Sequence, residues 1–291
     1  MPELPEVHAL VADLRGYLVG REVTSIQLAS FSALKTFDPP ISALNGLVVR
    51  GIERHGKYLD IVFDGPLHLI VHLALAGWIR KRAAGATAVK PTGRGPLIAR
   101  MMLARDSLPA DGLDITEWGT RKSAAIWLVR DPREVPGVER LGPDPLDPSF
   151  TIERFSEILA GAGRAQIKGV LRNQALIAGI GNAYSDEILH AAKMSPYKPA
   201  AMKPDETAQL FEAMQRELRA AIDRAEGIGA ADLKAEKKSN LKVHGRKGEP
   251  CPVCGDTIRQ VTFADRAFQY CPTCQTGGKP LADRVLSRLL K

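Results

Sequence analysis

The segment Met1-Pro2-Glu3-Leu4-Pro5-Glu6-Val7 opens a helical pattern that sets the start of the fold. From it, the spacing predicts a helix over 4–18, because apolar residues recur at the three- and four-residue intervals of one buried face. The residues on that face are Val7, Leu10, Val11, Leu14 and Leu18. Pro5 suits the first turn of such a helix, where its missing N–H costs nothing.

The next hundred residues change to a pattern of short strands. Gly, Pro and Asp separate the apolar runs, as they do at turns. Short strands at this spacing predict a β-sandwich or barrel. The expected strands are 23–28, 47–52, 58–63, 67–73, 97–103 and 124–129.

Helices follow a proline-rich segment. Five prolines between 131 and 150 exclude a regular element there, so 131–149 is expected to be a linker. The helical pattern covers 152–159, 167–174, 182–192 and 205–226, and the Lys/Gly/Ser-rich stretch 235–248 is expected to be a mobile loop. The predicted class is therefore α+β. Its predicted domains are 1–130 (sandwich with N-terminal helix), 131–149 (linker), 150–234 (helical) and 235–291 (loop and a small C-terminal module that contains all four cysteines).

Composition indicates a folded intracellular protein. Of 291 residues, 45% are hydrophobic and 25% charged, and no apolar run is long enough to span a membrane. The start lacks the features of a signal peptide, so a cytoplasmic protein, nucleoid-associated if bacterial, is expected. Residues 231–291 contain 12 Lys/Arg and 6 Asp/Glu, which is +6 of the net charge of +7. This basic end indicates a nucleic-acid partner, with a merely solvated tail as the alternative.

All four cysteines lie in one C-terminal cluster, Cys251-x2-Cys254 and Cys271-x2-Cys274. Two such pairs joined by a hairpin predict tetrahedral coordination of one Zn²⁺. Four protein ligands leave no open position, so this zinc is expected to be structural. The expected hairpin strands are 257–263 and 267–270. A zinc ribbon also occurs in transcription factors and ribosomal proteins, so it does not by itself define a function.

Several motifs together resemble the formamidopyrimidine-DNA glycosylase / endonuclease VIII family. The resemblance rests on the first seven residues, the cysteine cluster and further matches over most of the chain, in the family's order. Those matches are His55-Gly56-Lys57-Tyr58-Leu59, His72-Leu73, Leu141-Gly142-Pro143, 178–184 (AGIGNAY), 243–251 (VHGRKGEPC) and Arg266. The resemblance implies a DNA repair glycosylase with a β-sandwich, a helix–two-turn–helix domain over about 167–192 and a zinc finger.

The resemblance assigns the catalytic chemistry to Pro2. After removal of Met1, its secondary amine can attack C1′ of a damaged nucleotide, and the resulting iminium ion makes β (or β,δ) elimination easy. Glu3 is implied as the general acid and base, and Glu6 as a second carboxylate of the site. The alternative is that Pro2 only starts the helix and that both glutamates only favour its first turn. If Met1 is retained, Pro2 lies in a peptide bond and cannot attack.

Other residues are implied to hold DNA. Lys57 is expected to contact the phosphate beside the lesion and to assist catalysis, and Lys168 and Asn182 to hold the backbone on either side. The glycine-containing segment 179–182 precedes the predicted helix 182–192, and such a helix start suits phosphate binding. An ordinary N-cap role of Asn182 is compatible with this interpretation. Arg266 is expected to contact a phosphate from the hairpin tip. Further DNA-contact candidates are His72, Leu75 and Arg121.

The sequence departs from the family where side chains fill the gap left by the extruded base. Leu75 stands where the glycosylase branch usually has Met, and residues 120–124 (TRKSA) lack the usual Phe. The leading hypothesis is a monomeric bifunctional glycosylase and AP lyase acting on oxidised bases in damaged DNA. Such an enzyme must extrude the target nucleotide before it attacks C1′. One alternative is a damage- or abasic-site-binding protein without cleavage activity. Another is an unrelated zinc-ribbon transcription or RNA factor.

Overall fold

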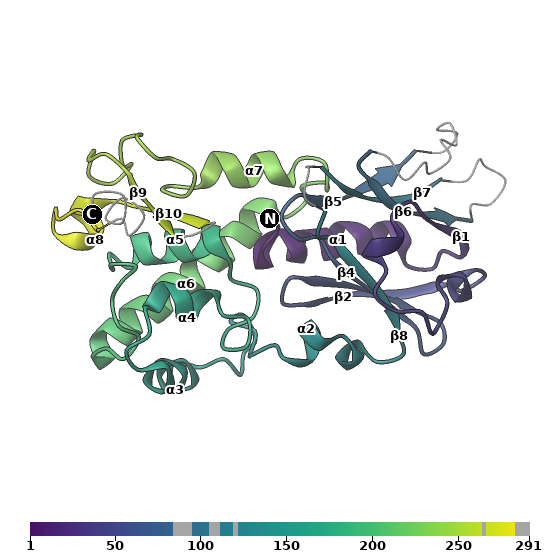
Figure 1. The fold of residues 1–291 in the computed structure, drawn as a ribbon, viewed down its shortest axis with the longest axis horizontal. Coiled ribbons are helices and arrows are strands. Elements are labelled where there is room, and N and C mark those ends of the chain that lie inside the picture. The colour runs from purple at the N-terminus through teal and green to yellow at the C-terminus, as the bar shows by residue number, and fades with distance from the viewer. Residues whose placement is uncertain (84–94, 105–110, 119–121, 264–265, 283–291) are drawn as a thin grey trace. The chain divides into compact units, whose positions relative to one another are not determined.

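The computed structural model describes residues 1–83, 95–104, 111–118, 122–263 and 266–282. The chain divides into two compact units (Figure 1). The first contains Met1–Arg140 and Ala225–Lys234, and the second contains Leu141–Arg224 and Ala235–Lys291.

The first unit is a β-sandwich with an N-terminal helix, as predicted. Helix α1 (Leu4–Leu18) has the expected bounds, and its buried face, with Leu10, Leu14 and Leu18 fully excluded from solvent, joins the core of the unit. Two antiparallel four-stranded sheets have the orders β1-β6-β7-β5 and β2-β3-β4-β8. The strands are β1 (Val23–Leu28), β2 (Val49–His55), β3 (Tyr58–Phe63), β4 (His68–His72), β5 (Gly77–Arg82), β6 (Leu97–Leu103), β7 (Asp111–Glu117) and β8 (Ala125–Val129), with 3-10 turns η1 (Phe31–Ala33) and η2 (Ile41–Leu44).

Strands β5 and β7 are absent from the prediction because charges interrupt their apolar pattern. Arg80 of β5 lies opposite Asp114 of β7 in the sheet register. The Arg100 guanidinium of β6 contacts the same Asp114 carboxylate at 2.7 Å. Cross-strand charge pairs thus stabilise strands that alternation alone does not reveal.

The proline-rich segment is more regular than the sequence predicts. A 3-10 turn η3 (Pro132–Glu134) and a one-turn helix α2 (Pro136–Glu139) form within it. Each has proline in its first turn, where the absent N–H leaves no broken hydrogen bond. Val135 and Val138 pack against Ile70 and Val129 of the sandwich.

The second unit is helical and ends in a small hairpin. Its elements are α3 (Ile152–Ala162), α4 (Ile167–Arg172), α5 (Asn182–Ala191), α6 (Pro204–Ala225), α7 (Leu233–Asn240), β9 (Arg259–Phe263), β10 (Arg266–Tyr270) and α8 (Pro272–Thr276). Helices α6 and α7 each extend by one or two residues into the first unit. Phe155, Leu171, Ile188 and Met214 are among its fully or almost fully buried core residues.

The expected loop over 235–248 is wrong in its first part, because α7 continues to Asn240. Its Ala, Glu and Lys residues are strong helix formers, which outweigh the low apolar content.

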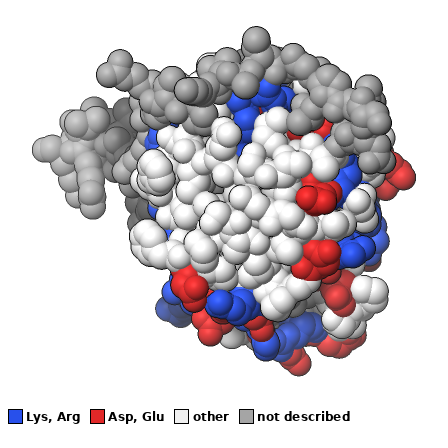
Figure 2. Space-filling model, turned by 90° about the vertical axis from the view of Figure 1, so that its right-hand side faces the viewer, with Lys and Arg blue, Asp and Glu red and all other residues white. Residues whose placement is uncertain are grey.

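Charge is unevenly spread over the face drawn in Figure 2. The face in Figure 2 has a broad uncharged centre with Lys, Arg, Asp and Glu around its edge. Charges of both signs are mixed along that edge, unlike the one-sign patch that attracts a polyanion. Among the described helices, none combines the length and apolarity that crossing a membrane requires.

Candidate active site and zinc site

Two buried carboxylates adjoin Pro2 at the start of α1. Glu3 is the N-cap residue, and its backbone N–H donates to the Glu6 carboxylate at 2.8 Å. The Glu3 side chain in turn caps the Glu6 backbone N–H, forming a capping box. Glu3 and Glu6 are only 2% and 3% exposed, and Pro2 is buried. The helix end favours negative charge at both positions, so a capping role and a chemical role are compatible.

Lys57 and His72 lie together at one end of the second sheet. Gly56, with φ of 55°, and Lys57 form the turn between β2 and β3. His72 ends β4 opposite Tyr58, and the two rings are 4.7 Å apart. Burial, followed by the charge of Lys57, lowers the pKa of His72 to about 4. The imidazole is therefore neutral at neutral pH, and the positive charge at this end of the sheet belongs to the buried Lys57.

Leu75 occupies the tight turn between β4 and β5. The Gly77 backbone N–H donates to the Leu73 carbonyl at 2.8 Å, and Ala74 adopts a positive φ of 49°. Leu75 remains 70% exposed, so its side chain faces solvent at this turn. The turn thus presents an apolar group to whatever binds there. Arg121, the other candidate near the extruded base, lies outside the described residues.

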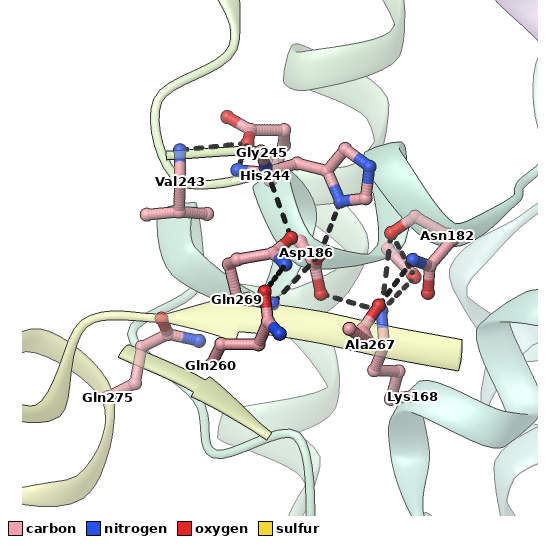
Figure 3. Close-up of polar contacts among 12 residues, drawn as sticks. Lys168, Asn182, Asp186, Val243, His244, Gly245, Gln260, Ala267, Gln269 and Gln275 are labelled. Atoms are coloured by element: carbon pink, nitrogen blue, oxygen red, sulfur yellow. Dashed lines mark hydrogen bonds and ion pairs between the residues drawn. The ribbon is translucent and has the colours of Figure 1, made fainter. Parts of the chain in front are cut away.

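Lys168 is held inside the helical unit by α5. Its ammonium contacts the Asp186 carboxylate at 2.6 Å and the Ser185 hydroxyl at 2.7 Å, and only 5% of the residue is exposed (Figure 3). It also donates to the Asn182 carbonyl at 3.3 Å. Lys168 therefore fixes the first turn of α5, and any effect on DNA would act through that turn.

Asn182 links α5 to the cysteine hairpin. Its Nδ2 donates to the Ala267 carbonyl of β10 at 2.7 Å (Figure 3). Its Oδ1 is buried and has no hydrogen-bond partner among the described residues. Arg266 precedes Ala267 and pairs with Phe263 across the β9–β10 hairpin. The structure thus joins the side chain of Asn182, one predicted DNA-contact residue, to the backbone of the residue that follows Arg266, the other.

Asp186 and Glu187 are buried acids that the sequence analysis did not single out. Asp186 also accepts from His244 Nδ1 at 2.7 Å and from the Gln269 backbone N–H at 3.2 Å. Glu187 accepts three consecutive backbone N–H groups, those of residues 242–244, at 2.7–3.0 Å. Two adjacent acids directly before the apolar pair Ile188 and Leu189 were the available signal, since charges that a helix buries are normally paired. They connect α5 to the 242–245 segment and to the hairpin.

The four cysteines converge as a metal site. Their sulfur atoms all lie within 4.8 Å of one another. Cys251 and Cys274 are separated by 3.9 Å, and Cys254 and Cys271 by 3.3 Å, between sulfurs. Tetrahedral zinc–sulfur bonds place sulfurs about 3.8 Å apart, so the arrangement fits the ion.

The predicted structural Zn²⁺ is therefore confirmed, with all four ligands supplied by the protein. His190 Nε2 lies 3.3 Å from the Cys251 sulfur and supports the site from α5.

The fold and these sites define a class of zinc-finger proteins with a sandwich domain and a helix–two-turn–helix domain. Three family models match in order: Formamidopyrimidine-DNA glycosylase N-terminal domain over residues 1–125, Formamidopyrimidine-DNA glycosylase H2TH domain over 141–232, and Zinc finger found in FPG and IleRS over 248–277. The chain belongs to the formamidopyrimidine-DNA glycosylase / endonuclease VIII family. The family resemblance and the predicted fold class are thereby confirmed.

Individual relatives agree with this assignment. A formamidopyrimidine-DNA glycosylase of Symbiobacterium thermophilum is 35% identical over 288 residues, covering 94% of this chain and 89% of that protein. An uncharacterized formamidopyrimidine-DNA glycosylase-like protein of Mycobacterium tuberculosis is 57% identical over 157 residues, covering 54% of this chain and 98% of that protein. The solved Lactococcus lactis Fpg, bound non-covalently to DNA containing an AP site, is 30% identical with a TM-score of 0.79, covering 94% and 99% of the two chains.

Proposed function

We propose that this chain is a DNA base-excision repair enzyme, a glycosylase for oxidised bases that also cleaves the abasic strand. Membership of the glycosylase family supports the reaction class. The observation that carries the proposal is the pair of buried carboxylates, Glu3 and Glu6, in the same helical turn that follows Pro2. A DNA-bound relative of the same fold supports damaged DNA as the partner.

The proposed nucleophile is the Pro2 nitrogen, freed by removal of Met1. Its lone pair forms a bond to C1′ while the bond from C1′ to the damaged base breaks, and the base leaves with a proton. Glu3 protonates the ring oxygen, which opens the sugar to a cationic iminium. Glu3, now a carboxylate, then takes a C2′ proton as the 3′ phosphate leaves, and hydrolysis of the iminium by water returns the secondary amine.

Residues on both units are proposed to hold the DNA. Lys57 supplies a buried cation for the phosphate beside the lesion, and Asn182 and Arg266 meet the backbone near α5 and the hairpin. Lys168 positions the α5 turn. Leu75 is the exposed apolar side chain available to fill the space of the extruded nucleotide, whose unstacking such contacts offset. His72 and Arg121 complete the proposed DNA contacts, and the enzyme is proposed to act as a monomer on the nucleoid.

Borohydride trapping tests the chemistry. Protein whose intact mass shows a free Pro2 is incubated with duplex containing an abasic site or an oxidised base, and sodium borohydride is added. A covalent protein–DNA adduct and a cleaved strand are expected. The matched control has the same sequence with its terminal amine acetylated, and it should bind but not trap. Absence of an adduct from the free-amine protein would refute the proposal.

A damage-binding protein without cleavage is the second candidate. The substitution of Leu75 for the usual Met and the absence of Phe in 120–124 favour it, because both changes fall where base extrusion is supported. It predicts salt-dependent binding to abasic duplex with an intact strand. A denaturing gel of the same reaction separates the two candidates.

A further inference from the structure

A second group of metal-ligand side chains lies on the β2-β3-β4-β8 sheet, apart from the cysteines. Glu53 pairs with Asp60 across β2 and β3, and His55 follows Glu53 by two residues. His68 of β4 is opposite Val62, two residues from Asp60. Residues two apart in a strand share a face, so the sheet register brings all four side chains to one face.

The centre of this group is a buried carboxylate. Asp60 is 0% exposed in a strand that is otherwise apolar or aromatic (YLDIVF). His55 Nε2 and His68 Nδ1 each lie 3.0 Å from Asp60 Oδ2. Burying a carboxylate is costly unless it is paired or bound to a metal. The burial of Asp60 therefore depends on its interactions with neighbouring groups and not on packing alone.

The geometry suits a metal ion as well as a hydrogen-bonded group. One ligand atom from each of Glu53, His55 and Asp60 lies within 4.8 Å of the other two. Two ligands on a tetrahedral ion with bonds of about 2.1 Å are about 3.4 Å apart. The 3.0 Å between His55 and Asp60 would therefore change by only a few tenths of an ångström.

We propose that Glu53, His55 and Asp60 form a binding site for a divalent transition-metal ion of the zinc type. His68 acts as a positioning residue, because its Nδ1 holds the Asp60 carboxylate from the side, as outer partners of metal-bound carboxylates do. Mixed nitrogen and oxygen ligands favour such an ion over Mg²⁺, which prefers oxygen alone.

The surroundings of the site indicate an exchangeable ion. The Glu53 side chain is exposed and makes no hydrogen bond or ion pair with any described residue, so its carboxylate is available. With three protein ligands and an open side, water completes the coordination. The ion would join β2 to β3 beside the turn that carries Lys57, independently of whether Lys57 contacts DNA.

Cobalt titration of the zinc-loaded full chain tests the site. Loosely held metal is first removed with a mild chelator that leaves the cysteine-bound zinc in place. Calorimetry with Co²⁺ should then show one further equivalent bound. Visible absorption should show the weak bands of nitrogen and oxygen ligation without thiolate charge-transfer bands, whereas Mg²⁺ should give no saturable heat.

Matched variants decide which residues bind. His55→Gln and the surface change Glu53→Gln should each abolish or strongly weaken this equivalent, and His68→Gln should weaken it about 10- to 100-fold. His8→Gln, an exposed histidine change on α1, should leave it intact. Circular dichroism confirms that the variants fold, and Glu53→Gln tests the site even if His55→Gln misfolds. Absence of a further equivalent in the wild type, or equal binding by wild type and Glu53→Gln, would overturn the proposal.

Discussion

His72 shows how burial changes the chemistry of a single residue. Its ring is buried, lies tilted against Tyr58, and is near the charge of Lys57; burial and that charge each disfavour the protonated form. Because the His72 imidazole is neutral, the positive charge at this end of the second sheet comes from Lys57. Neither the burial nor the neighbouring charge is visible from the His72-Leu73 motif.

The lowered pKa of His72 predicts a pH-dependent stability. Above about pH 6.5 the imidazole is neutral in both the folded and unfolded chain, and it contributes no pH dependence. Between about 6.5 and 4 the unfolded chain binds the proton more readily, so the free energy of unfolding falls as the pH falls. Urea unfolding at pH 4–8 should show a smaller loss over this range for His72→Gln than for the wild type. Parallel curves would contradict the assignment.

Asp186 is expected to be the most sensitive acidic residue of the second unit. Asp186→Asn leaves the buried Lys168 ammonium without its charge partner and weakens the contacts to His244 and Gln269. Breaking a buried pair in this way costs about 3–5 kcal/mol. Thermal and urea unfolding measure the change. The control Asp205→Asn, at an exposed position in α6, should change stability by less than about 0.5 kcal/mol; a similar small effect at Asp186 would refute the role.

At the scale of elements, glycine has different roles in the first helix and in the β4–β5 turn. Gly16 lies near the end of α1, where an added Cβ would meet nothing within 4 Å. At Gly77 an added Cβ would lie 2.0 Å from the Leu73 carbonyl oxygen. The turn that exposes Leu75 therefore depends on the absence of a side chain at Gly77.

The same substitution at these two glycines should have opposite effects. Gly16→Ala should stabilise the first unit by about 0.5–1 kcal/mol, because alanine reduces the entropy of the unfolded chain in a helix. Gly77→Ala should destabilise it and displace Leu75. Calorimetric melting temperatures of the two variants check this. A stabilised Gly77→Ala protein would show that the turn relaxes freely.

At the scale of the whole molecule, zinc is expected to stabilise the second unit, which contains the cysteine ribbon, and not the sandwich. The cysteine ribbon is joined to α5 through Asn182 and Ala267, through Asp186 and Gln269, and through His190 and Cys251. The sandwich core is a separate hydrophobic cluster. Local unfolding caused by loss of the metal should therefore extend into α5 and leave the sandwich folded.

Zinc removal tests this separation. A strong chelator should unfold the ribbon, because a module this small folds around its metal. Hydrogen exchange should then rise over 242–276 and the first turn of α5, while protection of α1 and the sandwich strands remains. Affinity for abasic duplex should fall with the ribbon. An equal loss of protection in both units would contradict the two-unit account, and zinc readdition serves as the control.

The amino-acid sequence by itself determined the elements whose signals are local. The bounds of α1, β1, β3 and β6 follow from apolar periodicity and turn residues, and the zinc ligands follow from cysteine spacing. These features depend on neighbours a few residues away. The family motifs likewise indicated a glycosylase before any contact was known.

Tertiary structure decided what depends on distant partners. Strands β5 and β7 are stabilised by cross-strand charges, and Asp186 has its role because α4, the 242–245 segment and β10 converge on it. The meeting of Glu53, His55 and Asp60 depends in the same way on strand register. Burial and pairing of charges arise only when segments far apart in sequence come together, so no local pattern of residues encodes them.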